Sequence, residues 1–426
     1  MEKMEKIVSL CKRRGFIYPG SEIYGGLANT FDLGPLGVEL ANNIKASWWK
    51  TFVQNRDDIY GLDGGILMSP KIWDASGHTK GFIDVLVDCK KCKKRFRQDH
   101  AKDKCPDCGG ELTNPRKFNP MFKTFIGPVE QDSSIVYLRP ETAQAIFVNF
   151  KNIIDSFHPK LPFGIAQIGK AFRNEITLGN FIFRKLEFEQ MEIEYFIKQE
   201  NWKKHFENWK KEMEKWFLGL GINKKNIRWR NHKADELSHY SKKTEDIEYK
   251  FPFGFKELYG LAYRYDYDLK QHSNASGKEL KYQEVDNNKF FPHIIEPSFG
   301  LERTILAVLN EAYHEDGKRI LLKLKPSLAP IKVAIFPLLS NKPELVKQAR
   351  KVYDLLKNDF VCAWDARGNI GKRYFAQDEA GTPFCVVFDF DSLKDKSVTI
   401  RHRDTMKQER IKIDELKKYL RKKINE

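Results

Sequence analysis

Long apolar runs are missing from this sequence. No stretch approaches the ~20 consecutive apolar residues that a membrane-spanning helix needs. Residues 1–16 mix acidic and basic side chains and lack the apolar core of a signal peptide. Polar low-complexity blocks are also missing, and 41% of the 426 residues are hydrophobic, which argues against extensive disorder. We therefore expect a cytoplasmic globular protein with about two to three domains and no membrane partner.

Cysteine is scarce, and its count of seven is odd. An odd count without a secretory signal does not indicate a disulfide framework. Three cysteines stand alone in apolar surroundings, which predicts buried reduced thiols: Cys11, Cys362 and Cys385. The other four form a CxxC-x12-CxxC pattern that is typical of zinc sites: Cys89, Cys92, Cys105 and Cys108. Because four thiolates complete a tetrahedral ion, we expect structural Zn²⁺; chance clustering is the alternative.

Acidic residues number 58 against 74 lysines and arginines, which gives a net charge of +16. This excess favours a polyanionic partner, because phosphate contacts release counterions and steer encounter. Residues 394–426 hold twelve basic and six acidic side chains, a local net charge of +6. A lysine-rich solvated surface explains the same numbers, so charge alone does not specify nucleic-acid binding.

Hydrophobic spacing predicts the main helices and strands. A helix begins near Pro35 and continues to about residue 55, with the proline in the first turn. Residues 201–220 carry a large apolar stripe that is typical of an amphipathic helix packed on a core. Between residues 161 and 196, short β-like runs surround a Gly-Asn turn, which indicates antiparallel pairing. A further helix is expected over residues 298–313.

The last part of the chain has a different pattern. Pro326 and Pro330 bracket a short segment that resembles a linker. Beyond it, strand-like and helix-like segments alternate as far as the strand-like PFCVVFDF. Such alternation predicts a separate α/β domain with a partly parallel sheet.

Arginine, acidic and aromatic residues recur around the predicted Gly-Asn turn. Arg173 precedes Glu175 by two residues, and after the turn Arg184 is followed by Phe188 and Glu192 at intervals of four. On a strand, Arg173 and Glu175 would share one face. An arginine fork can hold a phosphate and an aromatic ring can stack on a purine, whereas a structural ion pair is the alternative.

A second group of polar residues lies at a predicted strand-to-helix junction. The sequence there is EPSFGLER, from Glu296 to Arg303. Gly300 lets a ligand approach the backbone closely, and Arg303 would lie in the first turn of the helix.

The window FRNE…FR(x3)F(x3)E resembles motif 2 of class II aminoacyl-tRNA synthetases. The string GLER resembles motif 3 of the same enzymes. The helix led by Pro35 resembles their dimer-forming motif 1 region. Longer strings resemble glycyl-tRNA synthetases of the homodimeric type. They include YPGSEIYGGLANTFDLGPLGVELANNI, WDASGHTKGFIDVLVDCKKC, RPETAQAIF, ELYGLAYRYDYDL and IGKRYFAQDEAGTPFCVVFDFD, and they span the chain from about residue 18 to 403.

The resemblance implies an α+β catalytic domain built on an antiparallel sheet flanked by helices, plus a C-terminal α/β anticodon-binding domain and a small zinc-ribbon insert. The resemblance implies a catalytic domain over residues 1–325, a linker over 326–331 and an anticodon-binding domain over 332–426. Within the catalytic domain it implies the zinc-ribbon insert at about 88–112 and a helical insert at about 199–250.

The resemblance also implies an ATP site. Arg173 matches the arginine that grips the α-phosphate, and Arg184 matches the one directed toward the outer phosphates. Phe188 would stack on the adenine with Arg303 on the opposite face, and Mg²⁺ would neutralise the phosphates. The expected ATP-binding residues are Arg173, Asn174, Glu175, Arg184, Phe188, Glu257 and Arg303, with Arg173 and Arg303 as catalytic residues.

Glycine is expected to bind in an acidic pocket, again by resemblance. The matching positions around its ammonium group are Glu141, Glu192, Glu296 and Ser298, and Arg264 resembles the arginine that handles the carboxylate. A substrate without a side chain offers only its two charged groups, so charged hydrogen bonds must supply the binding. Bulky pocket walls can exclude larger amino acids without a separate editing site.

The implied activity is that of a glycine–tRNA ligase. It would form glycyl-adenylate from glycine and ATP, transfer glycine to the 3′ end of tRNA(Gly), and act as a homodimer. The alternatives are a class II synthetase for another small amino acid and a non-catalytic nucleic-acid-binding paralogue. Two positions near the motif 2 loop, Leu178 and Leu186, depart from the family pattern and concern contact with the tRNA acceptor end.

Overall fold

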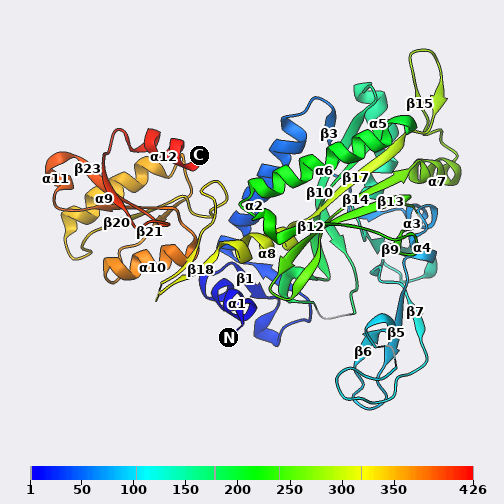
Figure 1. Cartoon of the computed structure of the whole chain (residues 1–426), viewed down its shortest axis with the longest axis horizontal. Helices are drawn as coiled ribbons and strands as arrows, with labels where there is room; N and C mark the ends of the chain where they lie inside the picture. The colour runs from blue at the N-terminus through cyan, green and yellow to red at the C-terminus, as the bar shows by residue number, and fades with distance from the viewer. Residues whose placement is uncertain (1, 102, 177–178, 239, 318, 426) are drawn as a thin grey trace.

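The computed structural model describes residues 2–101, 103–176, 179–238, 240–317 and 319–425. A larger N-terminal body and a smaller C-terminal body lie side by side, and a β-rich insert projects from the larger one (Figure 1). Over these residues, no helix is both long enough and apolar enough to span a membrane.

Seven strands of the described chain form the central sheet of the larger body, in the order β12-β13-β14-β17-β11-β10-β3. Neighbouring strands are antiparallel, except that β3 pairs with β10 in parallel. The strands are β3 Ile59–Gly61, β10 Phe163–Phe172, β11 Glu187–Ile197, β12 Ile227–Asn231, β13 Lys243–Phe251, β14 Gly254–Tyr265 and β17 His293–Gly300. The antiparallel pairing of β10 with β11 confirms the prediction for this region.

The two faces of the sheet differ in polarity, and β11 shows why. Successive side chains of a strand point to opposite faces. The odd-numbered side chains of residues 191–197 are buried in the main hydrophobic core. Gln190, Glu192 and Glu194 alternate with them and lie on the other face, where they are also buried. The sequence QMEIEYFI therefore specifies one apolar face and one polar face.

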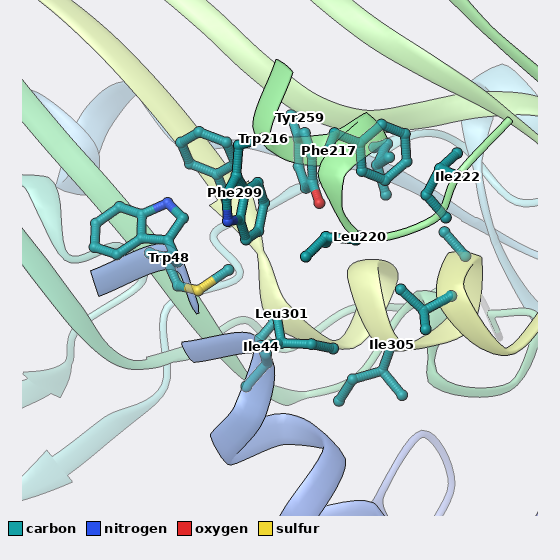
Figure 2. Packing of buried hydrophobic residues seen from close by; sticks show 14 of the residues in the cluster. Ile44, Trp48, Trp216, Phe217, Leu220, Ile222, Tyr259, Phe299, Leu301 and Ile305 are labelled. Carbon is teal, nitrogen blue, oxygen red and sulfur yellow. The ribbon is translucent and has the colours of Figure 1, made fainter. Parts of the chain in front are cut away.

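Three helices cover the apolar face: α2 Pro35–Trp49, α6 Trp202–Gly219 and α8 Leu301–Ala312. Figure 2 shows Trp48 and Trp216 packed beside Phe299 of β17, with ring centroids 5.8 and 5.4 Å from that of Phe299. Each such buried side chain contributes about 1.5–3 kcal/mol. Pro35 occupies the start of α2 and the apolar stripe of α6 is buried, so both helix predictions are confirmed.

Helices α5 Ala143–Phe157 and α7 Tyr267–Ser276 pack on the opposite face. They cover the region where β11 ends and where β10 and β17 begin, because Phe150 of α5 contacts Phe163 and Phe196. The sheet with helices on both faces confirms the expected α+β fold class of this body.

The projecting insert holds three antiparallel strands in the order β6-β5-β7 (Figure 1). They are β5 Asp84–Asp88, β6 Arg95–Arg97 and β7 Arg116–Phe118. Cys89 follows β5 directly, and the second CxxC lies between β6 and β7. Gly109, after the second CxxC, has a φ of 69°, which glycine adopts without strain, so the sharp turn predicted here is confirmed.

The smaller body is built on a five-stranded sheet in the order β21-β20-β22-β23-β24. Strands β21, β20 and β22 are parallel, and β23 and β24 are antiparallel, which confirms the partly parallel sheet. Helices α9 and α12 share one hydrophobic cluster with the sheet, and α10 contributes to a second cluster. The elements are β20 Val333–Pro337, α9 Pro343–Leu356, β21 Cys362–Trp364, α10 Ile370–Ala380, β22 Phe384–Phe388, α11 Ser392–Asp395, β23 Ser397–His402, β24 Gln408–Lys412 and α12 Leu416–Asn425.

The remaining helices and strands connect or flank these units. They are α1 Lys3–Arg14, β1 Ile17–Pro19, β2 Phe31–Leu33, β4 Leu67–Met68, α3 Pro70–Ala75, α4 His78–Gly81, β8 Lys123–Phe125, β9 Ile135–Leu138, β15 Tyr282–Gln283, β16 Lys289–Phe290, β18 Tyr313–Asp316 and β19 Arg319–Leu322.

Three expectations about local structure are wrong. The segment Phe181–Phe183 is a short 3₁₀ helix instead of a strand, and Phe181 has a φ of 57° that interrupts an extended chain. Helix α8 begins at Leu301, because the preceding residues complete β17. Residues 199–250 are not a helical insert: α6 is followed by β12 and most of β13, which extend the central sheet.

Asp378 of α10 joins the two bodies through a buried ionic contact. Its carboxylate is fully buried and accepts a hydrogen bond of 2.8 Å from Arg319 Nε on β19. Arg401 of β23 donates to both carboxylate oxygens at 2.8 and 3.0 Å. Arg319 also lies 3.7 Å from the exposed carboxylate of Asp316. Loss of Asp378 would therefore remove the carboxylate that Arg401 contacts and the closer of the two that Arg319 contacts.

Substitution Asp378→Ala should therefore lower the free energy of unfolding of the smaller body by about 3–5 kcal/mol, as expected for breaking a buried ion pair. Asp354→Ala is the matched control, because its ion pair with Lys357 is 47% exposed on the aspartate side. The control should change stability by less than about 1 kcal/mol. Urea unfolding followed by circular dichroism measures both, and equal effects would contradict a stabilising role for this contact.

Candidate active site

A cavity opens on the polar face of the central sheet, beside the loop between β10 and β11. The empty space inside it, which includes solvent at the open mouth, is about 1240 Å³. Ten of the twelve residues predicted to bind ATP or glycine line it: Glu141, Arg173, Glu175, Arg184, Phe188, Glu192, Glu257, Glu296, Ser298 and Arg303. The fold therefore brings together residues that are far apart in the sequence.

Arg173 follows the last residue of β10. Its Nε donates a hydrogen bond of 2.9 Å to the carbonyl oxygen of Pro140, and its guanidinium carbon lies 5.4 Å from the ring centroids of both Phe82 and Phe188. These contacts fix the plane of the guanidinium group at the cavity wall. A guanidinium group held in this way can offer its terminal nitrogens to a phosphate as a fork.

Glu175 and Arg184 lie on either side of the motif 2 loop. Arg184 Nε is 3.7 Å from a carboxylate oxygen of Glu175, and both residues line the cavity. The expectation that Arg173 and Glu175 share a strand face is wrong, because β10 ends at Phe172 and the Glu175 N–H donates 2.7 Å to the Arg173 carbonyl oxygen in a tight turn.

Arg303 lies in the first turn of α8, as predicted. Its guanidinium carbon is 4.5 Å from the ring centroid of Phe183, and its terminal nitrogen is 3.2 Å from a carboxylate oxygen of Glu257. The Arg303 charge lowers the pKa of Glu257, whose side chain is 53% exposed. Phe183 is thus the ring that stacks with Arg303 in this structure, and sequence reasoning missed it as a cavity residue.

Glu192 is the most extensively bonded acid in the cavity. One of its oxygens accepts hydrogen bonds from Ser298 Oγ at 2.8 Å and from Gln190 Nε2 at 2.7 Å. The other accepts from the hydroxyl and the backbone N–H of Thr142. Burial and the nearby charge of Glu141 raise the pKa of Glu192. These donors fix the carboxylate at the junction of β11, β17 and the start of α5.

Glu141 precedes α5 and is held from two sides. Its carboxylate accepts a hydrogen bond of 3.0 Å from Gln144 Nε2 and lies 3.2 Å from His78 Nε2. Burial opposes ionisation, but the His78 and Arg264 charges together with the hydrogen bonds outweigh it, so the pKa of Glu141 lies below its usual range. Glu141 is therefore an anionic wall of the cavity.

Arg264 is one of the two predicted residues that do not line the cavity. It is fully buried, and it donates two hydrogen bonds of 2.8 Å to the carboxylate of Asp268 and one of 2.9 Å to Glu296. Its guanidinium carbon lies 3.8 Å from the ring centroid of Tyr240, which covers it. The structure thus places Arg264 behind the cavity wall, where it holds Glu296, and its role toward a ligand carboxylate stays a prediction.

The protein-family models and curated relatives agree with this geometry. Residues 127–312 match the model of the tRNA synthetase class II core domain (G, H, P, S and T), and residues 332–423 match the anticodon binding domain. The chain is 52% identical to the glycine–tRNA ligase of Alkaliphilus oremlandii over 99% of this chain and 98% of the relative. It is also 52% identical to that of Treponema denticola, over 97% and 95% of the two chains, and to that of Clostridium acetobutylicum, over 99% and 98%.

The chain belongs to the glycine–tRNA ligase family. This membership confirms the resemblance in the sequence, the class II core and the C-terminal anticodon-binding fold. The limits expected for each domain and the roles of the individual cavity residues stay predictions.

Several polar residues that line the cavity were not predicted from the sequence. Tyr240 and Gln190 line it, as do His232 and Asp246, whose side chains are 2.6 Å apart. Burial and the charge of Glu257 raise the pKa of Asp246 to about 6. Gln190 could have been found from the sequence, because it precedes Glu192 by two residues on β11 and shares its face.

Two positions singled out in the sequence, Asn174 and Leu186, do not line the cavity. Asn174 is in the loop after β10, where its N–H donates 2.8 Å to the Pro120 carbonyl oxygen, and it does not line the cavity. Leu186 donates its N–H to the carbonyl oxygen of Asn29. Leu178 lies outside the residues that the structure describes.

The four cysteines of the insert form one cluster, whose sulfur atoms all lie within 4.8 Å of one another. The Cys89–Cys108 and Cys92–Cys105 sulfur pairs are 3.5 and 3.6 Å apart. A tetrahedral ion with bonds of about 2.3 Å to sulfur needs sulfur–sulfur distances of about 3.8 Å. The donor set therefore fits a metal that prefers thiolates. Cys11 and Cys385 are buried free thiols, as predicted, and Cys362 is partly buried.

The buried position of Arg264 leads to a prediction about stability. Substitution Arg264→Met should lower the free energy of unfolding by about 3–5 kcal/mol, because Asp268 and Glu296 would stay buried without their cation. The loss should be larger at pH 8 than at pH 5. Burial already raises the folded-state pKa of Glu296 above its unfolded value, and loss of Arg264 would raise it further, so stability falls more steeply as the pH rises through that interval.

Arg228→Met provides the control, because Arg228 pairs with Glu248 but is 57% exposed. It should change stability by less than about 1 kcal/mol and without this pH dependence. Denaturant unfolding of both variants at the two pH values tests the idea. A stable Arg264→Met protein would show that Arg264 is not needed to hold the carboxylates.

Proposed function

We propose that this protein is a glycine–tRNA ligase that activates glycine with ATP and transfers it to the 3′ end of tRNA(Gly). One observation carries the proposal: a single cavity is lined by arginines with aromatic rings and by three mutually interacting buried glutamates, Glu141, Glu192 and Glu296, in a chain of this family. The arginines and rings suit a nucleotide triphosphate, and the three glutamates suit a small ammonium-bearing substrate.

Activation requires the glycine carboxylate to attack the α-phosphate of ATP in line, with pyrophosphate as the leaving group. Arg173 connects the aromatic and the acidic residues of the cavity, since it contacts Phe188 and interacts with the charge of Glu192. It therefore stabilises the negative charge that develops on the α-phosphate. Alignment of the two substrates supplies the rest, and no residue of the chain needs to act as a nucleophile.

ATP enters as its Mg²⁺ complex, and the outer phosphates face Arg184 and Arg303. The purine would stack with Phe188 and the pair formed by Phe183 and Arg303. A cation over an aromatic ring contributes about 0.5–2 kcal/mol, and the planar guanidinium group can also stack on a purine. The adenylate formed here would keep these contacts until the terminal adenosine of tRNA attacks its carbonyl carbon.

Glycine selectivity follows from the acids and from the lack of space around them. Glu141, Glu192 and Glu296 are each less than 9% exposed, line the cavity and lie close enough for their charges to interact. They would surround the ammonium group, with Ser298 fixing Glu192. A larger amino acid would need room for its β-carbon among fixed, buried side chains, so steric exclusion can replace editing.

The smaller body would bind the anticodon arm of tRNA. The local net charge of +6 over residues 394–426 suits a phosphate backbone. For the larger body we propose assembly into a homodimer through the region of α2 and the preceding loop. Ile23 and Tyr24 of that loop are 89% and 88% exposed, and Val38 of α2 is 42% exposed, so this surface offers apolar contacts to a second copy.

The cysteine cluster would hold one structural Zn²⁺ ion through Cys89, Cys92, Cys105 and Cys108. When bound, this ion would link the turn after β5 to the turn before β7. It lies in the projecting insert, and all four positions around it are taken by protein sulfur atoms, so it would stabilise the insert without entering the reaction.

Substitution Arg173→Ala should reduce glycine-dependent ATP–pyrophosphate exchange by at least about 10²-fold, because it removes a preorganised charge from the transition state. The control is Arg367→Ala in the smaller body, where Arg367 is 92% exposed and far from the cavity. It should leave exchange unchanged. Near-normal exchange in Arg173→Ala would remove Arg173 from the mechanism, and exchange with serine or threonine in place of glycine would contradict the substrate.

The purified protein should contain about one zinc ion per chain, measured by plasma emission spectroscopy. Cys92→Ser should reduce this content, because three thiolates hold the ion less tightly. Cys362→Ser, in the smaller body, is the matched control and should keep full zinc content. Because the insert is separate from the cavity, Cys92→Ser should lower the exchange activity less than it lowers the zinc content. A metal-free wild-type protein with an intact insert would contradict the zinc site.

A further inference from the structure

Glu194 is a buried acid that the proposed chemistry does not use. It lies on β11, its side chain is fully buried, and it does not line the cavity. Neither of its carboxyl oxygens has a hydrogen-bond partner among the described residues. An ionised carboxylate without a partner is strongly disfavoured in such a place, whereas a neutral carboxylic acid is tolerated.

The register of the sheet places Glu194 directly across from Glu296. Strands β11 and β17 pair Glu192 with Ser298 and Tyr195 with Ile295, so the residue opposite Glu194 is Glu296. Directly opposed side chains on one face of an antiparallel pair have Cβ atoms about 4.5–5.5 Å apart. Two acids are therefore held side by side by the backbone itself.

The surroundings of this pair carry more acid than base. The charges that act on the pair come from three acids and one base, namely Glu192 on β11, Asp268 on α7, Glu141 before α5 and Arg264 on β14. Tyr240, after β12, also interacts with Glu296. Farther out, His78 of α4 contacts Glu141, His272 of α7 contacts Gln144, and Arg139 after β9 interacts with Glu192. Gln167 on β10 is uncharged, and its amide also lacks a hydrogen-bond partner within the described chain.

Arg264 cannot neutralise both members of the pair. Two of its nitrogens donate to Asp268 and the third donates to Glu296, so Glu194 receives no hydrogen bond from it. Burial raises the pKa of Glu296 to about 8 and moves the pKa of Glu194 well above its usual range, with the charge of Glu296 as the second cause. Both directions agree with the geometry.

We propose that the ammonium group of glycine takes the place of a proton in this pocket: Glu296 is protonated while the pocket is empty and ionised when glycine is bound, beside a Glu194 that stays a neutral acid. The inference rests on the proposed function. The exchange balances, since Glu296 releases one proton to solvent as one ammonium charge arrives. Glu194 stays neutral in both states, so Glu296 is the one acid of the pair that changes its charge.

Calorimetry with the wild-type full chain tests the exchange. Glycine titrated at pH 7 in phosphate and in Tris should give different heats that correspond to about one proton released per glycine bound. The KM for glycine in pyrophosphate exchange should fall about tenfold per pH unit as the pH rises from 6 toward 8, by one-proton linkage. Equal heats in the two buffers would overturn the inference, whereas a complete lack of glycine-dependent exchange would overturn the proposed function instead.

Two variants test which of the two acids releases the proton when glycine binds. Glu194→Gln replaces a neutral acid by a neutral amide of the same shape, so folding, proton release and the pH profile should match the wild type, with the KM for glycine within about threefold. A rise of 100-fold or more, or failure to fold, would show that Glu194 is ionised. Glu296→Gln should bind glycine weakly and without proton release at saturating glycine; continued release would place the proton on another acid.

Glu207→Gln is the control for the general effect of replacing a glutamate by a glutamine outside the pocket. Glu207 lies on α6, and its side chain is 54% exposed on the surface away from the pair. This variant should match the wild type in proton release, pH profile and KM. A changed profile in this control would show that the measurement reports surface charge, which would overturn the assignment to the pocket.

Discussion

Each strand at the centre of the larger body has to serve a water-free core on one face and a charged cavity on the other. The period of two along a strand makes this possible, because neighbouring residues point in opposite directions. On β11, β14 and β17 the apolar residues pack on α2, α6 and α8, and the residues between them build the cavity floor. A shift of register by one residue would exchange the two sets, so a correctly paired sheet and a formed cavity are one requirement.

This constraint explains what could be predicted from the sequence. The helices at Pro35 and at residues 202–219 follow from apolar periodicity, and ten of the twelve proposed ligand-binding residues line one cavity. The predictions failed where tertiary contacts decide the outcome. Phe181–Phe183 has the composition of a strand but folds as a 3₁₀ helix, and there Phe183 meets Arg303. The sequence also does not show that Arg264 is bonded to Asp268 and Glu296, because these contacts join residues that only the fold brings together.

Buried charge is tolerated in this fold because it is shared. Asp378 serves two arginines between the bodies, and Arg264 serves two acids beneath the cavity. In both places a single buried group of one sign contacts two of the other. Between the bodies the exposed Asp316 lies 3.7 Å from Arg319 and supplies a second negative charge. Beneath the cavity the excess is negative, and a cationic substrate can correct it.

The same imbalance connects stability to substrate selection. A pocket preformed for an ammonium group has to keep several acids close together before that group arrives, and this arrangement disfavours the empty state. Protonation of an acid that faces another acid relieves the repulsion without moving any side chain. The walls can then stay rigid, and rigid walls are what an enzyme for the smallest amino acid requires, because it must reject every larger one by shape alone. The acidity of the pocket and its steric selectivity therefore depend on the same buried carboxyl pair.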